Sequence, residues 1–136
     1  MVAGEAKGEI GPGLLLYIGI GKDDGEKALV YLADKVPALR IFPDEEGKMN
    51  RSLLEFGGEI LAVSQFTLYG DCRKGRRPGF SDSMEPQAAQ ALYESLVARW
   101  RAMGIETRTG VFQEDMLVES VNWGPATFLL DSEKNF

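Results

Sequence analysis

The stretch EILAVSQFTL, residues 59–68, gives the strongest strand signal in this chain. Its first half is continuously apolar, which is typical of a strand in the middle of a sheet. Its second half, Ser64-Gln65-Phe66-Thr67, places three polar side chains in four positions. Because side chains alternate along a strand, Gln65 and Thr67 share one face, and Ser64 and Phe66 share the other. The stretch therefore predicts a central strand that ends with an amide and a hydroxyl side by side.

Weaker signals surround this strand and are separated by Gly and Pro. We expect further strands over residues 13–20, 39–42, 105–112, 116–121 and 126–130, helices over about 25–36 and 86–103, and a helical turn at 52–56. Both helices repeat apolar residues at helical spacing, and Pro86 and Gly104 mark the ends of the longer one. This order predicts an α+β fold, a single compact domain with mostly antiparallel sheets and two main helices packed on one side.

The chain contains 136 residues, no histidine and one cysteine, Cys72. This length suits one domain. The missing histidine excludes a Ser-His-Asp triad, a Cys-His dyad and imidazole metal ligands, and the single cysteine excludes internal disulfides and multi-cysteine metal centres. The acidic pairs show no ordered ligand spacing. We therefore expect no metal and no cofactor, and chemistry that uses carboxylates, hydroxyls, lysine, backbone amides or groups of the substrate.

Positive charge is concentrated in one segment of an otherwise acidic chain. The net charge is −6, whereas residues 71–80 carry +3, because four basic residues oppose Asp71, and this leaves −9 for the rest. The four residues of this basic loop are Arg73, Lys74, Arg76 and Arg77. Such a loop suits the phosphates of an RNA backbone. A solvated surface loop is an equally good interpretation.

The chain lacks the sequence features of a membrane or exported protein. No stretch reaches the roughly 18 apolar residues that a membrane span requires, and residues near Met1 do not follow the basic-then-apolar order of a signal peptide. A single unpaired cysteine agrees with a reducing compartment. These features predict a cytoplasmic protein.

The remaining local patterns each have a simple structural explanation beside a functional one. Polar residues at 64–67 suit a strand that leaves the core, or a group that binds a developing oxyanion. The Gly124-Pro125 step after Asn122 suits a hairpin turn, in which X-Pro bonds are occasionally cis. Cys72 lies beside basic residues that favour a thiolate, but the chain has no histidine to serve as its base.

The order of these patterns together resembles a known family. Matching stretches are GEIGPGLL (8–15), RIFPDEEGKMN (40–50), AVSQFTLYGD (62–71), GRRPGFS (75–81) and VNWGPATF (121–128). Two of them contain specific motifs, Ser-Gln-Phe-Thr at 64–67 and Asn-x-Gly-Pro-x-Thr at 122–127. Over nearly its whole length the chain resembles the D-aminoacyl-tRNA deacylases of the bacterial and eukaryotic type.

The resemblance implies a function and a mode of selection. Members of this family are cytoplasmic homodimers that hydrolyse the ester between a D-amino acid, or glycine, and the last ribose of tRNA. Their Gly-Pro bond, matched by Gly124-Pro125 beside Asn122, is cis and enters the active site of the partner subunit. There its carbonyls bind the substrate amino group and leave no room for an L side chain. The glycine substrate implied here is glycyl-tRNA mischarged on tRNA(Ala).

The resemblance also implies roles at the reaction centre. It places Ser64, Gln65, Phe66 and Thr67 beside the ester, and the basic loop on tRNA phosphates. Thr67 is viewed in the family either as a nucleophile or as a stabiliser of a reaction that depends on the 2′-OH of tRNA. A chain without histidine favours the second view, because a Thr nucleophile needs an adjacent base.

Two departures from the family pattern stand out. Family members begin with a further strand that carries Gln-Arg-Val, and about one strand's worth of residues is missing before Val2. We therefore expect residues 1–136 to form the deacylase domain without its first strand, with one sheet edge unpaired. The family most often has Asp where this chain has Trp123, at the variable position of a motif whose Gly-Pro geometry we expect to be kept.

Two other functions compete with a deacylase. One is a non-catalytic RNA-binding relative that lost its activity together with the first strand. The other is a thioesterase-like hydrolase that uses Thr67 or Cys72 on a small acyl ester.

Overall fold

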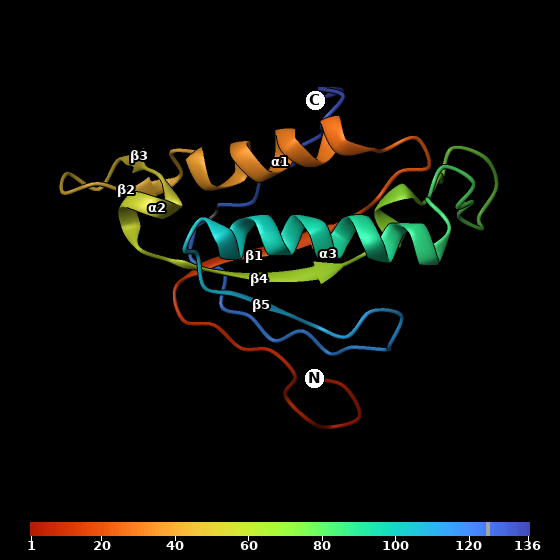
Figure 1. Ribbon diagram of the computed structural model, residues 1–136, viewed down its shortest axis with the longest axis horizontal. Helices are drawn as coiled ribbons and strands as arrows, with labels where there is room; N and C mark the ends of the chain where they lie inside the picture. The colour runs from red at the N-terminus through yellow and green to blue at the C-terminus, as the bar shows by residue number, and fades with distance from the viewer. Residues whose placement is uncertain (125) are drawn as a thin grey trace.

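A three-stranded sheet in the order β1-β4-β5 forms the centre of the computed structural model, which describes residues 1–124 and 126–136 (Figure 1). Its strands are β1 (Gly13–Ile18), β4 (Glu59–Ser64) and β5 (Thr107–Thr109). The apolar first half of residues 59–68 is therefore the middle strand, as predicted. β1 and β4 pair along their whole length, from Gly13 opposite Glu59 to Ile18 opposite Ser64.

The strand directions differ from the predicted ones. Both pairings of the central sheet are parallel, so the prediction of mostly antiparallel strands is wrong for this sheet. Parallel neighbours need long crossover connections, and the two main helices provide them. The helix α1 (Glu26–Ala38) lies on the connection from β1 to β4, and α3 (Pro86–Ala102) joins β4 to β5.

Both main helices lie on the same side of the sheet, as predicted, and enclose the core with it (Figure 1). Ile60 and Ala62 of β4 are fully buried beneath them. The Tyr93 hydroxyl of α3 donates a hydrogen bond to the Ala62 carbonyl at 2.7 Å. This buried bond satisfies the polar end of an otherwise apolar ring and fixes α3 on the middle strand.

A second, smaller unit precedes β4. It consists of an antiparallel pair, β2 (Phe42–Pro43) and β3 (Met49–Arg51), followed by the short helix α2 (Leu53–Phe56). Ser52 and Glu55 cap this helix reciprocally, since each side chain accepts a hydrogen bond from the other residue's backbone N–H. The hydrogen bonds to Ser52 lower the pKa of Glu55. The predicted helical turn at 52–56 is thus confirmed.

Two predicted strands do not form. Residues 116–121 and the described residues 126–130 have no regular secondary structure. Leu117, Val121 and Leu129 of these segments are exposed, whereas Leu130 packs, partly buried, against the core. The one backbone pairing found for this part of the described chain joins Leu117 to Met1. Without a continuous partner strand, apolar residues alone do not make a ladder.

A buried hydrogen bond joins the two main helices where α1 lacks a donor. Pro37 lies within α1 and has no N–H, so the carbonyl of Ala33, four residues earlier, cannot receive its usual helical hydrogen bond. The indole N–H of Trp100 on α3 donates to this carbonyl at 3.1 Å. Both Ala33 and Trp100 are buried, so the indole supplies the donor that water cannot.

This geometry predicts a coupled effect on stability. Trp100→Phe leaves the Ala33 carbonyl buried without a donor, which costs about 1–3 kcal/mol in addition to the loss of packing. Pro37→Ala restores a backbone N–H at position 37, so Trp100→Phe is expected to cost less in that background. Urea unfolding of the wild type, both single variants and the double variant measures the difference. An equal cost of Trp100→Phe in both backgrounds would contradict this role of the indole.

Candidate functional site

The segment after β4 carries the predicted catalytic residues, and it turns earlier than predicted. β4 ends at Ser64, and residues Phe66–Tyr69 form a single turn of 3-10 helix, η1, instead of continuing the strand. The backbone N–H of Gln65 donates to the Ile18 carbonyl at 2.8 Å, which extends the pairing with β1 by one more bond. The site segment therefore starts from a fixed point at the end of β1.

Gln65 and Thr67 lie together, but not through strand alternation. The Gln65 side-chain amide donates a hydrogen bond to the Thr67 hydroxyl oxygen across the turn. An oxygen that accepts this bond keeps its own O–H available to donate. Accepting a hydrogen bond also withdraws electron density from the oxygen, which makes it a poorer nucleophile. The contact suits a hydroxyl that donates to a negative charge.

Backbone donors accompany this hydroxyl. Within the described residues, the N–H groups of Phe66 and Thr67 have no hydrogen-bond acceptor. The Phe66 side chain is 57% exposed, and the side chain of Thr67 is exposed as well. These donors are therefore open to a ligand, and together they can bind an oxygen on which negative charge develops.

The titratable group at the end of η1 is unsuited to act as a base. Burial and, after it, the negative charge of Asp24 raise the pKa of Tyr69 to about 12. Tyr69 therefore stays protonated near neutral pH, and a protonated phenol cannot accept a proton from Thr67. The site provides hydrogen-bond donors rather than a titrating catalyst.

The basic loop follows directly and is closed at its base. Backbone hydrogen bonds in both directions join Asp71 and Gly79, at 2.7 and 3.0 Å. Asp71 also binds the guanidinium of Arg73 through both carboxylate oxygens, at 2.9 and 2.7 Å. The Arg73 side chain and its backbone N–H hold the pKa of Asp71 at about 2. Asp71 thus orients Arg73 in addition to lowering the net charge of the loop.

The other basic side chains of this loop stay available. Lys74, Arg76 and Arg77 are exposed and form no ion pair with the carboxylates that the structure describes. Cys72 is also exposed, and its thiol lies 3.9 Å from the Gly70 carbonyl, with no base beside it among the contacts found. The loop therefore presents three cations without an ion-pair partner among the described carboxylates, and one exposed thiol.

An aromatic contact joins this loop to the site segment. The rings of Phe66 and Phe80 meet edge to face, with centroids 5.1 Å apart. Phe80 closes the basic loop, and Phe66 precedes Thr67 in the chain. This contact connects the end of the basic loop to the residue that precedes Thr67.

The second motif is a tight exposed turn. The Asn122 side-chain amide donates to the Thr127 hydroxyl at 3.1 Å, across the turn that contains Gly124. A Cβ on Gly124 would lie 1.9 Å from the backbone nitrogen of Ala126, so no side chain fits there without a change of backbone. Pro125, and with it the predicted cis bond, lies outside the described residues.

The two motifs have no hydrogen bond to one another in the part of the chain that the structure describes. None of the hydrogen bonds found for the described residues joins the Asn122–Thr127 turn to Gln65 or Thr67. The turn also carries Trp123, which is 93% exposed. The residues of both motifs thus remain open to molecules outside this subunit.

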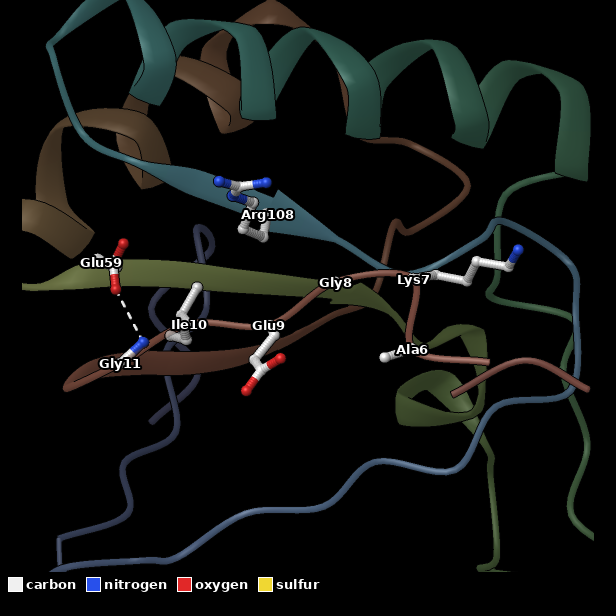
Figure 2. Close-up of a pocket in the computed structure, with 8 residues that line it drawn as sticks. All are labelled: Ala6, Lys7, Gly8, Glu9, Ile10, Gly11, Glu59 and Arg108. Atoms are coloured by element: carbon white, nitrogen blue, oxygen red, sulfur yellow. Dashed lines mark hydrogen bonds between the residues drawn. The ribbon is translucent and has the colours of Figure 1, made fainter. Parts of the chain in front are cut away.

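A separate groove of about 570 Å³ lies on the sheet, beneath the N-terminal segment. It is lined by Ala6, Lys7, Gly8, Glu9, Ile10, Gly11, Glu59 and Arg108. Figure 2 shows that Lys7, Glu9 and Arg108 point in different directions, while Glu59 accepts a hydrogen bond from the Gly11 backbone. The groove contains none of the predicted site residues and no convergent polar set, so we assign it no part in the site.

Two further properties bear on the class of site. In the described parts of the chain, no three Cys, Asp or Glu side chains lie close enough together to hold a metal ion. No helix there has both the length and the apolar character needed to cross a bilayer. The arrangement that remains is a set of hydroxyl, amide and backbone donors beside a basic loop, which can stabilise an oxyanion on an anionic, RNA-like substrate.

Sequence comparison assigns the family. Residues 1–131 match the family model described as D-Tyr-tRNA(Tyr) deacylase. The D-aminoacyl-tRNA deacylase of Symbiobacterium thermophilum is 57% identical over 135 residues, which cover 99% of this chain and 89% of the relative. The enzyme of the same name from Anaeromyxobacter dehalogenans is 54% identical, with coverage of 99% and 91%. The chain belongs to the D-Tyr-tRNA(Tyr) deacylase family.

Solved structures agree with the α+β deacylase fold. The protein titled c-Myc DNA Unwinding Element Binding Protein superimposes with a TM-score of 0.86 at 35% identity, covering 93% of this chain and 86% of the other. A probable eukaryotic D-amino acid tRNA deacylase matches with a TM-score of 0.66 at 21% identity, over 78% and 77% of the two chains. The second likeness shows the fold alone.

Proposed function

We propose a mechanism and a mode of substrate selection for the activity that defines this family. The chain is a D-aminoacyl-tRNA deacylase, an enzyme that hydrolyses the ester bond between amino acid and tRNA. The products are the free D-amino acid and a tRNA that can be charged again. The finer proposals concern the role of Thr67, the Gly124-Pro125 step, the partner subunit and the basic loop.

Thr67 acts as a hydrogen-bond donor and not as the nucleophile. The observation that carries this proposal is the Gln65 side chain, which donates to the Thr67 oxygen and leaves the Thr67 proton free to donate. Water attacks the ester carbonyl, and the carbonyl oxygen becomes negative. Thr67 and the N–H groups of Phe66 and Thr67 stabilise that charge, while Ser64 ends the strand that positions them. When the bond to the ribose then breaks, the 3′-oxygen leaves with the proton that the water gives up, relayed by the neighbouring 2′-OH, so that the products are the free amino acid and tRNA.

The Gly124-Pro125 step of one subunit rejects L-amino acids at the reaction centre of the neighbouring subunit. The turn is tight at Gly124, is held by Asn122 and has no bond to the site segment of its own subunit. Backbone carbonyls there bind the substrate amino group and occupy the space that an L side chain needs. Exclusion of this kind leaves glycine acceptable, because glycine has no side chain to exclude, so glycyl-tRNA(Ala) is a second substrate.

Exposed apolar side chains support a homodimer in which this insertion takes place. Val121 is 97% exposed and Trp123 is 93% exposed, although both are apolar. Leu117, Phe128 and Leu129 of the same segment are also more than half exposed. Apolar exposure concentrated in this way marks a surface that another protein surface covers. The covering surface is that of a second copy, which receives the Gly124-Pro125 turn at its own reaction centre.

The basic loop holds the tRNA acceptor end. Arg73 is oriented by Asp71, while Lys74, Arg76 and Arg77 are exposed. Phosphate contacts of this kind give affinity without reading sequence, which suits an enzyme that accepts many tRNAs. The enzyme works in the cytoplasm, where aminoacyl-tRNA is made and used.

The first prediction concerns chirality. The purified enzyme is expected to hydrolyse D-tyrosyl-tRNA and to leave L-tyrosyl-tRNA intact, as measured by release of labelled tyrosine. Gly124→Ala and Pro125→Ala are expected to reduce this discrimination or to abolish activity, because the turn must then change shape. Cys72→Ala serves as the control and keeps full activity. Equal hydrolysis of the two enantiomers by the unsubstituted enzyme would contradict the proposed function.

The second prediction concerns Thr67. Thr67→Val removes the donor at constant shape and is expected to lower kcat by about 10²–10³, the usual effect of losing one oxyanion donor, whereas Thr67→Ser keeps most activity. A substrate with a 2′-deoxy terminal ribose is expected to react slowly even with the wild type. The pH–rate profile is expected to show no enzyme group titrating near the histidine value of about 6.5. A trapped acyl ester on Thr67 would show instead that the hydroxyl is a nucleophile.

The third prediction concerns the partner subunit. Val121→Lys adds a charge at a position that is almost fully exposed in one subunit, so the subunit itself still folds. Sedimentation is expected to show a dimer for the wild type and a monomer for the variant, with loss of D-specific hydrolysis in the monomer. Leu54→Lys adds the same charge at another exposed apolar residue and is expected to change neither property. A monomer with full chiral activity would rule out insertion from a partner.

A further inference from the structure

Tyr69, the last residue of η1, lies directly against two glycines that follow β1. A Cβ on Gly21 would lie 2.6 Å from the Tyr69 hydroxyl oxygen and 2.9 Å from Cζ of the ring. A Cβ on Gly19 would lie 3.2 Å from two other ring atoms of Tyr69. Neither glycine has a positive φ, so these positions need glycine for space and not for backbone conformation. The Tyr69 ring therefore packs directly against the backbone of Gly19 and Gly21.

This contact of Tyr69 is the second point at which the segment after β4 is held in place. The first is the hydrogen bond from the Gln65 N–H to the Ile18 carbonyl, at 2.8 Å. Both attachments therefore join η1 to β1 or to its direct continuation. Thr67 lies between them and is itself exposed, so the direction of its hydroxyl depends on how the two ends are held.

The same continuation of β1 also holds the segment that directly follows the basic loop. Met84 N–H donates to the Ile20 carbonyl at 3.0 Å, and Lys22 N–H donates to the Asp82 carbonyl at 2.8 Å. A second contact joins the Lys22 ammonium to the Asp82 carboxylate at 3.0 Å. The backbone on which Tyr69 rests is thus a common base for the basic loop and for the reaction centre.

We propose that Tyr69 is a positioning residue for deacylation, because its ring on Gly19 and Gly21 sets the orientation of η1 and with it the direction of the Thr67 hydroxyl. This inference rests on the proposed role of Thr67 as the donor to the ester oxygen. Tyr69 acts through Thr67 and touches no reacting atom. Its ring does the positioning, and its hydroxyl is not required.

A set of variants tests the ring against the hydroxyl. Tyr69→Phe keeps the ring and is expected to leave kcat on D-tyrosyl-tRNA within about twofold, whereas Tyr69→Ala is expected to lower kcat about ten- to hundredfold at nearly constant KM, as misplaced catalytic groups do. Tyr31→Ala, the same truncation on α1, is the matched control and is expected to leave kcat unchanged. Arg76→Ala provides the contrast of a binding defect, with KM raised and kcat kept.

The contact with Gly21 gives a sharper test. Gly21→Ala pushes a methyl group into the Tyr69 ring and is expected to lower kcat about tenfold or more. In the Tyr69→Ala background the ring is gone, so the same substitution is expected to have little further effect. Such non-additivity is the signature of two groups in direct contact.

A measurement without substrate separates this inference from the proposed function. The backbone amide NMR signals of Phe66 and Thr67 are expected to shift in Tyr69→Ala and Gly21→Ala, and to stay in place in Tyr69→Phe and Tyr31→Ala. Unshifted signals in Tyr69→Ala, or a kcat that is kept while only the melting temperature falls, would overturn the positioning role. Loss of activity in Tyr69→Phe equal to that in Tyr69→Ala would overturn it too, by showing that the hydroxyl takes part. Absence of hydrolysis by the wild type would overturn the proposed function, whatever the amide signals show.

Discussion

The parallel pairing of β1 with β4 is the interaction on which the site depends. It runs from Gly13 opposite Glu59 to Ile18 opposite Ser64 and ends where both strands leave the sheet together. One further bond, from Gln65 to Ile18, carries the pairing into the site segment. A ladder of backbone bonds resists sliding, because a shift by one residue would turn every side chain to the opposite face. Residues 64–67, where we propose the reaction centre, therefore continue directly from the sheet.

The proposed mechanism depends on the placement of hydrogen-bond donors rather than on acid–base chemistry. A protein without histidine has no side chain that changes charge near neutral pH unless its surroundings shift one there, and the structure moves Tyr69 and Asp71 the other way, to about 12 and about 2. Charges around the site therefore stay constant over the physiological range. Hydrogen-bond donors such as the Thr67 hydroxyl need no proton exchange to act, provided they are aimed correctly. Accuracy of placement takes the part that a tuned pKa has in other hydrolases.

The structural features that could be predicted from the sequence are local ones. Helical spacing located α1 and α3 closely, and the apolar run at 59–63 located the middle strand, because such signals are contained within a few turns or one strand. Strand direction was not predictable, since it depends on which distant segments cross over the sheet. Apolar residues at 116–121 suggest a strand, yet none forms, and Leu117 and Val121 of this segment are exposed. Gln65 and Thr67 were placed together for the wrong reason, and Tyr69 was missed although glycines at 19 and 21, directly after a strand, signal that another group approaches closely.

The hydrogen bond between Trp100 and Ala33 makes the order of substitutions at positions 37 and 100 matter for stability. Pro37 makes the indole necessary, while the indole does not make Pro37 necessary. If Trp100 is replaced first, the Ala33 carbonyl is left buried without a donor. If Pro37 is replaced first, a backbone N–H is added, and replacing Trp100 afterwards costs the loss of packing alone. Positions 37 and 100, one on each main helix, are thus coupled. Replacing Pro37 before Trp100 gives a more stable intermediate than the reverse order.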